Sequence, residues 1–108
     1  MHKTLKFASH LVPLVLNGSK KTTWRLFDDK ELSVGDSVVF LEHGTGKQFG
    51  RAKITQVRVK ELGELTDEDW EGHERFSSQE EMYTTYKTYY TKNVDSKTLV
   101  KVIKFVLL

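Results

Sequence analysis

Residues 17–29 read NGSKKTTWRLFDD, and they place a cationic, hydroxyl-rich run directly after a helix-stop signal. The preceding residues are apolar, and Gly18 suits the left-handed position at a helix C-terminus. We therefore expect a short helix before Gly18, with Ser9 as its cap. Pro13 would fall just past the first turn of that helix, so either the first turn is irregular or the regular helix begins near Pro13.

The run that follows Gly18 is rich in threonine and aromatic residues, which predicts a strand over residues 21–27. Alternation along a regular strand gives two faces, one with Lys21, Thr23 and Arg25 and the other with Lys20, Thr22 and Trp24. On the plainer interpretation, Trp24 enters the core and the charged face lies in solvent. On the alternative interpretation, the charged face binds an anion or a nucleobase, because Arg25 offers a planar fork of donors.

The rest of the chain carries strand and helix signals in a clear order. Strands are predicted over residues 4–7, 37–43, 49–62 and 98–108, and helices over residues 65–72 and 77–92. The strand at 49–62 changes its apolar parity near Thr55 and Gln56, which predicts a bulge there. The order indicates one α+β domain over residues 1–108. Its sheet would be mainly antiparallel and barrel-like, with a short helix after the first strand and two helices before the last strand.

Both later helices begin with a spacing typical of a capping box. Thr66 lies three residues before Asp69, and Ser77 lies three residues before Glu80. The second of these helices is also rich in tyrosine, at positions Tyr83, Tyr86, Tyr89 and Tyr90. These rings are able to stack on nucleobases, but their helical spacing favours packing in the core.

The composition, with 38% hydrophobic and 30% charged residues, is that of an ordinary globular domain. No apolar run is long enough to cross a membrane, and the N-terminus lacks the apolar stretch of a secretory signal, so we expect a cytoplasmic protein. The chain has no cysteine, and its histidines (His2, His10, His43 and His73) lack the spacing of metal ligands. We therefore expect no metal or other cofactor and interpret the histidines as structural or exposed.

The net charge of +2 is too small to indicate nucleic-acid binding by itself, but the charges are unevenly distributed. Lys20, Lys21 and Arg25 form a cationic cluster, whereas residues 64–81 are strongly acidic. These two segments either attract each other as surface patches or form two walls of one site.

The segment GSKKTTWR at residues 18–25 resembles the Gly-x-Lys-x-x-x-x-Arg motif of the ASCH domain, a family named for homology to an activating signal cointegrator. The resemblance extends over nearly the whole chain. The helix before the motif, VGD at 34–36, LGELTDEDWEGHERF at 62–76 and VKVIKFVLL at 100–108 follow in the expected order. The resemblance implies a PUA-like β-barrel, a fold associated with RNA binding, with a cleft lined by the motif.

Family members commonly carry glutamate two residues before the motif arginine, where this chain has Thr23. The departure makes the chain similar to small bacterial ASCH proteins that hydrolyse the amide of N4-acetylcytidine with a lysine, a threonine and a distant glutamate. The matching positions are Lys20, Thr23 and, with a one-residue gap, Glu74. A desolvated lysine can act as nucleophile or base, a threonine hydroxyl can stabilise an oxyanion, and a glutamate can move protons to the leaving amine. Strand parity lets Lys20 meet Thr23 only if Lys20 belongs to the turn after Gly18, and Lys21 is the alternative.

Three functions remain open on these residues. The first is binding of RNA or a modified nucleoside in a cleft lined by Gly18, Lys20, Lys21, Thr23, Trp24 and Arg25 on one wall and Glu74 on the other. The second is hydrolysis of N4-acylated cytidine by Lys20, Thr23 and Glu74, and the third is a protein-interaction module. In the first two cases, we expect Arg25 to hold the cleft together through a bidentate pair with Glu74.

Overall fold

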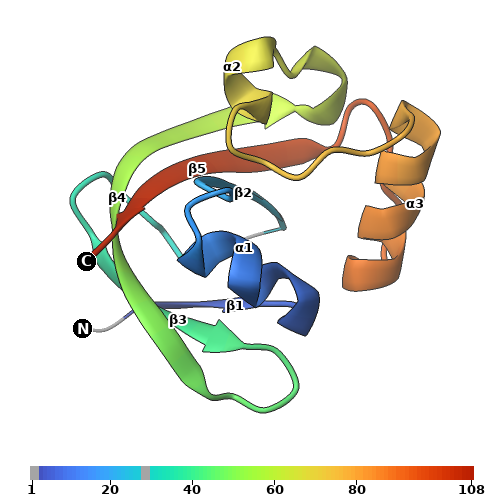
Figure 1. The fold of residues 1–108 in the computed structure, drawn as a ribbon. Helices are drawn as coiled ribbons and strands as arrows, with labels where there is room; N and C mark the ends of the chain where they lie inside the picture. Colours follow the sequence, from blue (N-terminus) through green and yellow to red (C-terminus); the bar gives the residue numbers. More distant parts are fainter. Residues whose placement is uncertain (1–2, 28–29) are drawn as a thin grey trace.

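Figure 1 shows the computed structural model, which describes residues 3–27 and 30–108. Five strands form one sheet in the order β1-β3-β4-β5-β2. The strands are β1 (Lys3–Phe7), β2 (Thr22–Leu26), β3 (Ser37–Glu42), β4 (Gln48–Glu61) and β5 (Leu99–Leu107). β1 pairs with β3 in parallel, and the other neighbouring strands are antiparallel. The sheet curls into a half-barrel with β1 and β2 at its edges, which confirms the predicted α+β fold with a barrel-like sheet.

The bulge predicted in the long strand β4 is confirmed. The pairing of β4 with β5 shifts register between Ile54 and Gln56, so Thr55 is the extra residue. Because of this extra residue, Ala52 and Ile54 before it and Val57 after it contact the same core. Figure 1 shows β4 and β5 curving together along their length.

The buried apolar side chains form two cores. The barrel core, inside the curl of the sheet, consists of Leu5, Phe7, Leu11, Val15, Leu32, Val38, Phe40, Ala52, Ile54, Ile103 and Phe105. The helix core, between the sheet and the later helices, consists of Trp24, Leu26, Leu62, Met82, Tyr86, Val94, Val100 and Val102. Alternation along β5 explains the division, because Val102 belongs to the helix core and its neighbour Ile103 to the barrel core.

The segment between β1 and β2 is helical, as predicted, in two parts. A 3-10 helix over Ser9–Leu11 precedes α1 (Val12–Leu16), so the first turn is irregular and Pro13 lies in the first turn of the regular helix. The predicted cap at Ser9 is wrong, since Ser9 lies within the 3-10 helix and no side chain caps its start. Gly18 has a φ of 85° and follows the helix in the left-handed conformation, as predicted.

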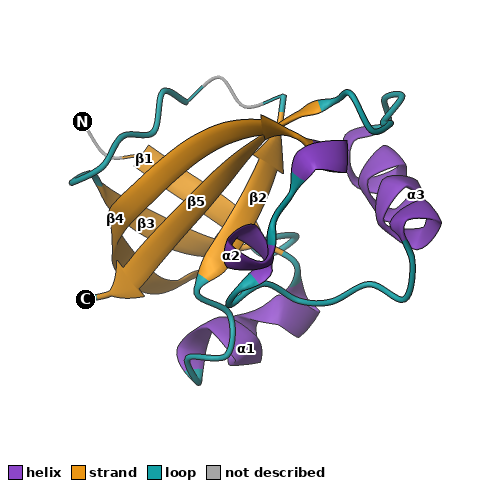
Figure 2. Ribbon diagram, turned by 90° about the horizontal axis from the view of Figure 1, so that it is seen from above, coloured by secondary structure: helices purple, strands orange, loops and turns teal. Residues whose placement is uncertain are grey.

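Three helical segments follow β4: η2 (Leu62–Glu64), α2 (Asp67–Trp70) and α3 (Gln79–Tyr90). The predicted start of α2 is confirmed, because the Asp69 carboxylate accepts a hydrogen bond from the Thr66 N–H at 2.9 Å. Figure 2 shows α2 in front of β2 and α3 to the right, at the other end of the loop that joins the two helices. No helix in the described part of the chain is both long and apolar enough to cross a membrane.

Helix α3 begins one residue later than its predicted capping box. Ser78 is the cap, and its hydroxyl accepts a hydrogen bond from the Glu81 N–H at 3.0 Å. The Glu81 carboxylate accepts hydrogen bonds from the N–H and hydroxyl of Ser77, the residue before the cap. The predicted pairing of Ser77 with Glu80 is therefore wrong by one position.

Candidate functional site

A pocket of about 420 Å³ lies where β1, β2, α3 and the loop after α2 meet. Its lining residues are Lys6, Phe7, Ala8, Leu11, Lys20, Thr23, Trp24, Arg25, His43, His73, Glu74, Tyr86, Thr88, Tyr89 and Tyr90. Seven of these side chains are apolar or aromatic, and the other eight are charged, hydroxyl-bearing or histidine side chains. A concave site that combines aromatic rings with convergent polar groups is typical of a binding site for a small organic ligand.

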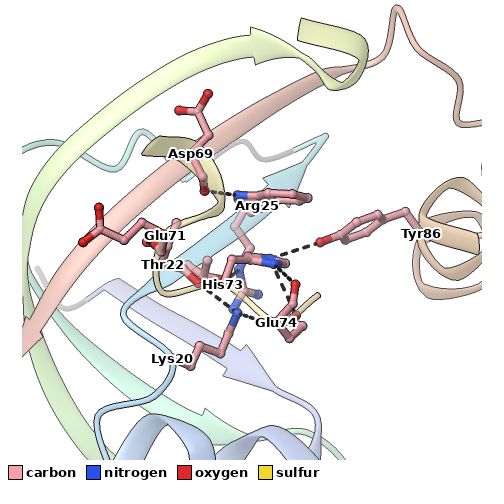
Figure 3. A network of polar contacts seen from close by, with 10 residues as sticks. Lys20, Thr22, Arg25, Asp69, Glu71, His73, Glu74 and Tyr86 are labelled. Carbon is pink, nitrogen blue, oxygen red and sulfur yellow. Dashed lines mark hydrogen bonds and ion pairs between the residues drawn. The ribbon is translucent and has the colours of Figure 1, made fainter. Parts of the chain in front are cut away.

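Lys20 is the buried cation of this pocket. It lies in the turn between Gly18 and β2, where its N–H donates to the Leu14 carbonyl at 2.9 Å. Its side chain is 2% exposed. The Lys20 Nζ donates to Glu74 Oε2 at 2.5 Å and to the Thr22 carbonyl at 2.9 Å, as Figure 3 shows. The condition for Lys20 and Thr23 to face one cleft is thus met, because Lys20 precedes the strand.

Gly72 allows the loop after α2 to deliver Glu74 to this lysine. The Gly72 carbonyl accepts hydrogen bonds from the Lys21 and Thr22 N–H groups at 2.7 and 3.1 Å. Gly72 has a φ of 76°, and a Cβ at this position would lie 2.8 Å from the Lys21 Cβ. Only glycine combines this backbone conformation with so close an approach to β2.

Burial and charge act in opposite directions on the Lys20–Glu74 pair. Burial lowers the pKa of Lys20, and this effect outweighs the stabilisation that Glu74 gives to the ammonium. Burial acts to raise the pKa of Glu74, but His73 and Lys20 outweigh it and the pKa falls below its usual value. Burial also lowers the pKa of His73 to about 3, so His73 is neutral at pH 7. The Lys20 ammonium is therefore the cation that holds Glu74 ionised at neutral pH.

His73 is held as a neutral ring between the helix core and the pocket. It stacks on Trp24 with ring centroids 3.8 Å apart. Its Nδ1 lies 2.7 Å from the Glu74 carbonyl and its Nε2 lies 3.4 Å from the Tyr86 hydroxyl. These contacts suit a neutral imidazole that donates from Nδ1 and accepts at Nε2. They fix the backbone of Glu74 as well as the ring.

Thr23 and Arg25 form a second polar pair in the pocket. The Arg25 Nε donates to Thr23 Oγ1 at 3.2 Å, and the guanidinium lies 4.8 Å above the centre of the Phe7 ring. The predicted bidentate pair between Arg25 and Glu74 is wrong, because Glu74 pairs with Lys20. Arg25 instead connects β2 with β1 across the pocket.

The other sequence-predicted site residues take different positions. Trp24 lines the pocket and is buried in the helix core, where its Nε1 donates to the Asp69 carbonyl at 3.2 Å. Lys21 is exposed and does not line the pocket, and Gly18 shapes the turn before Lys20 without lining the pocket. The functional roles of all these residues remain predictions.

The structure adds pocket residues that the sequence patterns did not single out. Lys6 and Phe7 come from β1, and His43 follows β3. Tyr89, expected in the core, is 53% exposed and lines the pocket. A strand-end lysine followed by an aromatic residue was visible in the sequence, but only the pairing of β1 with β3 brings it beside His43.

The described histidines differ in environment. His73 is buried, whereas His10 and His43 are exposed, and His2 lies outside the described residues. Within residues 3–27 and 30–108, no group of three or more histidine, aspartate or glutamate side chains is arranged to hold a metal ion.

Comparison with known proteins gives a family and a shared fold. A family model of the ASCH domain matches residues 1–108. No curated protein matches the chain significantly. Among solved structures, a protein from Enterococcus faecalis V583 has a TM-score of 0.82 and 15% identity, over 100% of this chain and 80% of that chain. An ASCH domain from Lactobacillus crispatus JV V101 has a TM-score of 0.73 and 15% identity, over 98% and 79% of the two chains. A protein from Pyrococcus furiosus has a TM-score of 0.68 and 22% identity, over 100% and 98%.

Proposed function

The chain belongs to the ASCH domain family, and from this premise we propose that its pocket binds an N4-acylated cytidine and hydrolyses the exocyclic amide. The family has a PUA-like fold and is linked to RNA binding. One observation carries the proposal. The Lys20 amine lies 2.5 Å from the Glu74 carboxylate, in a pocket that Thr23 also lines. A buried amine and an ionised carboxylate in contact can move two protons in one reaction.

The directions of the two pKa shifts assign the roles. Glu74 has a lowered pKa and a side chain that is 27% exposed, so it is a carboxylate that a water molecule can reach. It acts as the general base. Lys20 has a lowered pKa and is almost fully buried, so its ammonium gives up a proton more readily than a lysine in water. It acts as the general acid, which differs from the base or nucleophile suggested by the sequence.

Thr23 stabilises the charge that develops on the acyl oxygen. Its Oγ1 already accepts a hydrogen bond from Arg25, so the hydroxyl hydrogen is oriented toward another acceptor. An oxyanion in the pocket supplies that acceptor. Arg25 therefore positions Thr23 and adds positive charge near the reacting carbonyl.

The hydrolysis balances with water as the only co-reactant. Glu74 takes a proton from water while the water oxygen bonds to the acyl carbon, and the acyl oxygen becomes an oxyanion held by Thr23. The C–N bond then breaks and Lys20 gives its proton to the departing N4 nitrogen. The proton on Glu74 passes to Lys20 across their 2.5 Å contact, which restores both groups. The products are the carboxylic acid and cytidine.

The test is incubation of the protein with N4-acetylcytidine and detection of cytidine by chromatography. We expect wild-type protein to release cytidine, and Lys20→Ala to lower the rate about 100-fold or more, because a general acid contributes roughly that much. Lys21→Ala is the matched control, since Lys21 is the next residue but lies outside the pocket. The proposal is overturned if wild-type protein releases no cytidine, or if Lys20→Ala and Lys21→Ala react at the same rate.

Binding of a nucleobase without hydrolysis is the second candidate function. It is favoured by the second hydrogen bond of the Lys20 Nζ, which goes to the Thr22 carbonyl. A lysine with this bond and the bond to Glu74 can serve only to hold the loop after α2 against β2. On this function, cytidine and N4-acetylcytidine bind but neither is changed. Lys20→Ala would then weaken binding and lower stability together.

A further inference from the structure

The charges on the pocket lining do not cancel. Its cationic residues are Lys6, Lys20 and Arg25, and Glu74 is the carboxylate among the described lining residues. Lys20 and Glu74 neutralise each other through their ion pair. Lys6 has no ion-pair partner among the described residues, so the pocket mouth favours an anion over a neutral ligand.

Lys6 and His43 lie together because two strands run in parallel. β1 and β3 pair in register from Lys3 with Val38 to Phe7 with Glu42. The His43 N–H then donates to the Phe7 carbonyl at 2.8 Å. Both strands therefore end at the pocket, and both Lys6 and His43 are exposed there, whereas Lys20 is buried inside it.

The side chains of Lys6 and His43 are not engaged elsewhere in the described part of the chain. Neither has a side-chain hydrogen bond or ion pair within residues 3–27 and 30–108. Other cations of the sheet have structural partners, such as Lys3 with Asp36 at 2.8 Å and Lys60 with Asp69 at 2.7 Å. The donors of Lys6 and His43 thus remain available to a ligand at the pocket mouth.

We propose that Lys6 and His43 bind a phosphate group of the ligand, so that the pocket takes a nucleotide, free or within an RNA chain, rather than a free nucleoside. This inference rests on the proposed function and defines its substrate class. The base would lie at the buried Lys20–Glu74 pair, and the sugar-phosphate would lie at the exposed rim. Lysine is suited to a phosphate as a mobile point charge, and an imidazole N–H adds a directed donor.

The experiment compares N4-acetylcytidine, its 5′- and 3′-monophosphates and a short oligoribonucleotide with one N4-acetylcytidine. We expect kcat/KM to be about tenfold higher for at least one phosphate-bearing substrate than for the nucleoside, which corresponds to about 1.4 kcal/mol. Lys6→Gln should abolish that advantage, so that the nucleoside and the phosphate-bearing substrates react with the same kcat/KM. Lys53→Gln is the matched control, because Lys53 is an exposed strand lysine outside the pocket lining.

The arms of the experiment separate the outcomes. A monophosphate that equals or exceeds the oligoribonucleotide identifies a free nucleotide as the ligand, and the reverse identifies RNA. Equal rates for nucleoside and all phosphate-bearing substrates, or an advantage that Lys6→Gln retains, overturn the inference while the hydrolase survives. If no substrate is hydrolysed, the proposed function fails, and calorimetric binding of cytidine against cytidine monophosphates decides the inference. A preference for a monophosphate that Lys6→Gln removes supports it, and no preference overturns it.

Discussion

The barrel core and the helix core share the strands of one sheet but differ in what is buried beside them. The barrel core is apolar throughout, and its phenylalanine rings pack closely, with Phe40 at 4.7 Å from Phe7 and 4.9 Å from Phe105. The buried polar side chains gather instead on β2, the turn before it and the α2 segment: Lys20, Thr22, Thr23, Asp69 and His73. A buried polar group is costly without a partner, so each of them depends on a specific contact. The comparison separates a region that supplies stability from a region that supplies chemistry.

The largest effect is expected from a cavity in the barrel core. Phe40 is almost fully buried, and Phe40→Ala should lower the free energy of unfolding by about 3–5 kcal/mol. Urea denaturation measures the change, with Val106→Ala as the control because Val106 is 51% exposed. Hydrolysis per folded molecule should remain near the wild-type value. A rate that falls as steeply as the stability would show that the two regions are not separate.

Removal of the carboxylate tests the opposite region. Glu74→Gln deletes the proposed base and leaves the Lys20 ammonium buried without its counter-ion. We expect the hydrolytic rate to fall about 100- to 1,000-fold, a larger relative loss than the accompanying loss of stability. Glu71→Gln is the control, since the contact of Glu71 with Thr22 uses its backbone carbonyl. Similar hydrolytic rates in the two variants would remove Glu74 from the chemistry.

Acid should destabilise the helix core before it affects the barrel core. The pKa of His73 falls from 6.5 to about 3 on folding, so between these values the unfolded chain binds a proton that the folded chain does not. The contribution of neutral His73 to the free energy of unfolding is therefore fully present above pH 6.5. It decreases as the pH falls, by about 2 kcal/mol by pH 4.5. Denaturation curves at both pH values measure this loss.

Two histidine variants complete the acid experiment. His73→Gln should flatten the dependence between pH 6.5 and 4.5, whereas His10→Gln, at an exposed position, should retain it. The carboxylates with lowered pKa values are Asp36, Asp69, Glu74 and Glu81, and they act mostly below this window. An unchanged slope in His73→Gln would mean that another group titrates there.

The sequence predicted what depends on local signals. The bulge at Thr55 follows from strand parity, and the end of the first helix follows from Gly18, which needs no distant contact. Strand parity allowed Lys20 to face the same cleft as Thr23 only if Lys20 lay in the turn before the strand. Lys20 does lie in that turn, where the alternation of the strand does not apply. These elements are set by backbone geometry that nearby residues control.

Contacts between distant segments were harder to predict from the sequence. Only the family resemblance grouped Lys20 with Glu74, and the ion pair of Glu74 was assigned to Arg25, whereas the close approach at Gly72 brings the loop to the turn and pairs Glu74 with Lys20. His43 was predicted to be structural or exposed, and it is exposed, but only the parallel pairing of β1 with β3 brings it to the pocket. Both positions depend on the packing of segments far apart in the chain.

The smallest effect is expected at Arg25, which lies where the two regions meet. Its guanidinium rests on Phe7 of the barrel core while its Nε donates to Thr23 in the pocket. Arg25→Lys keeps the charge but loses the planar group that makes both contacts at once. We expect kcat to fall about tenfold because the Thr23 hydroxyl is no longer oriented, with little change in KM for the neutral nucleoside. The free energy of unfolding should fall by about 1 kcal/mol or less, since the cation–π contact is partly exposed.

Chromatographic rates and urea denaturation give both values, and Lys101→Arg, the reverse exchange at the residue paired with Arg25 on β5, is the control. A wild-type kcat in Arg25→Lys would reduce Arg25 to a charge at the rim and leave Thr23 to be oriented by the ligand alone.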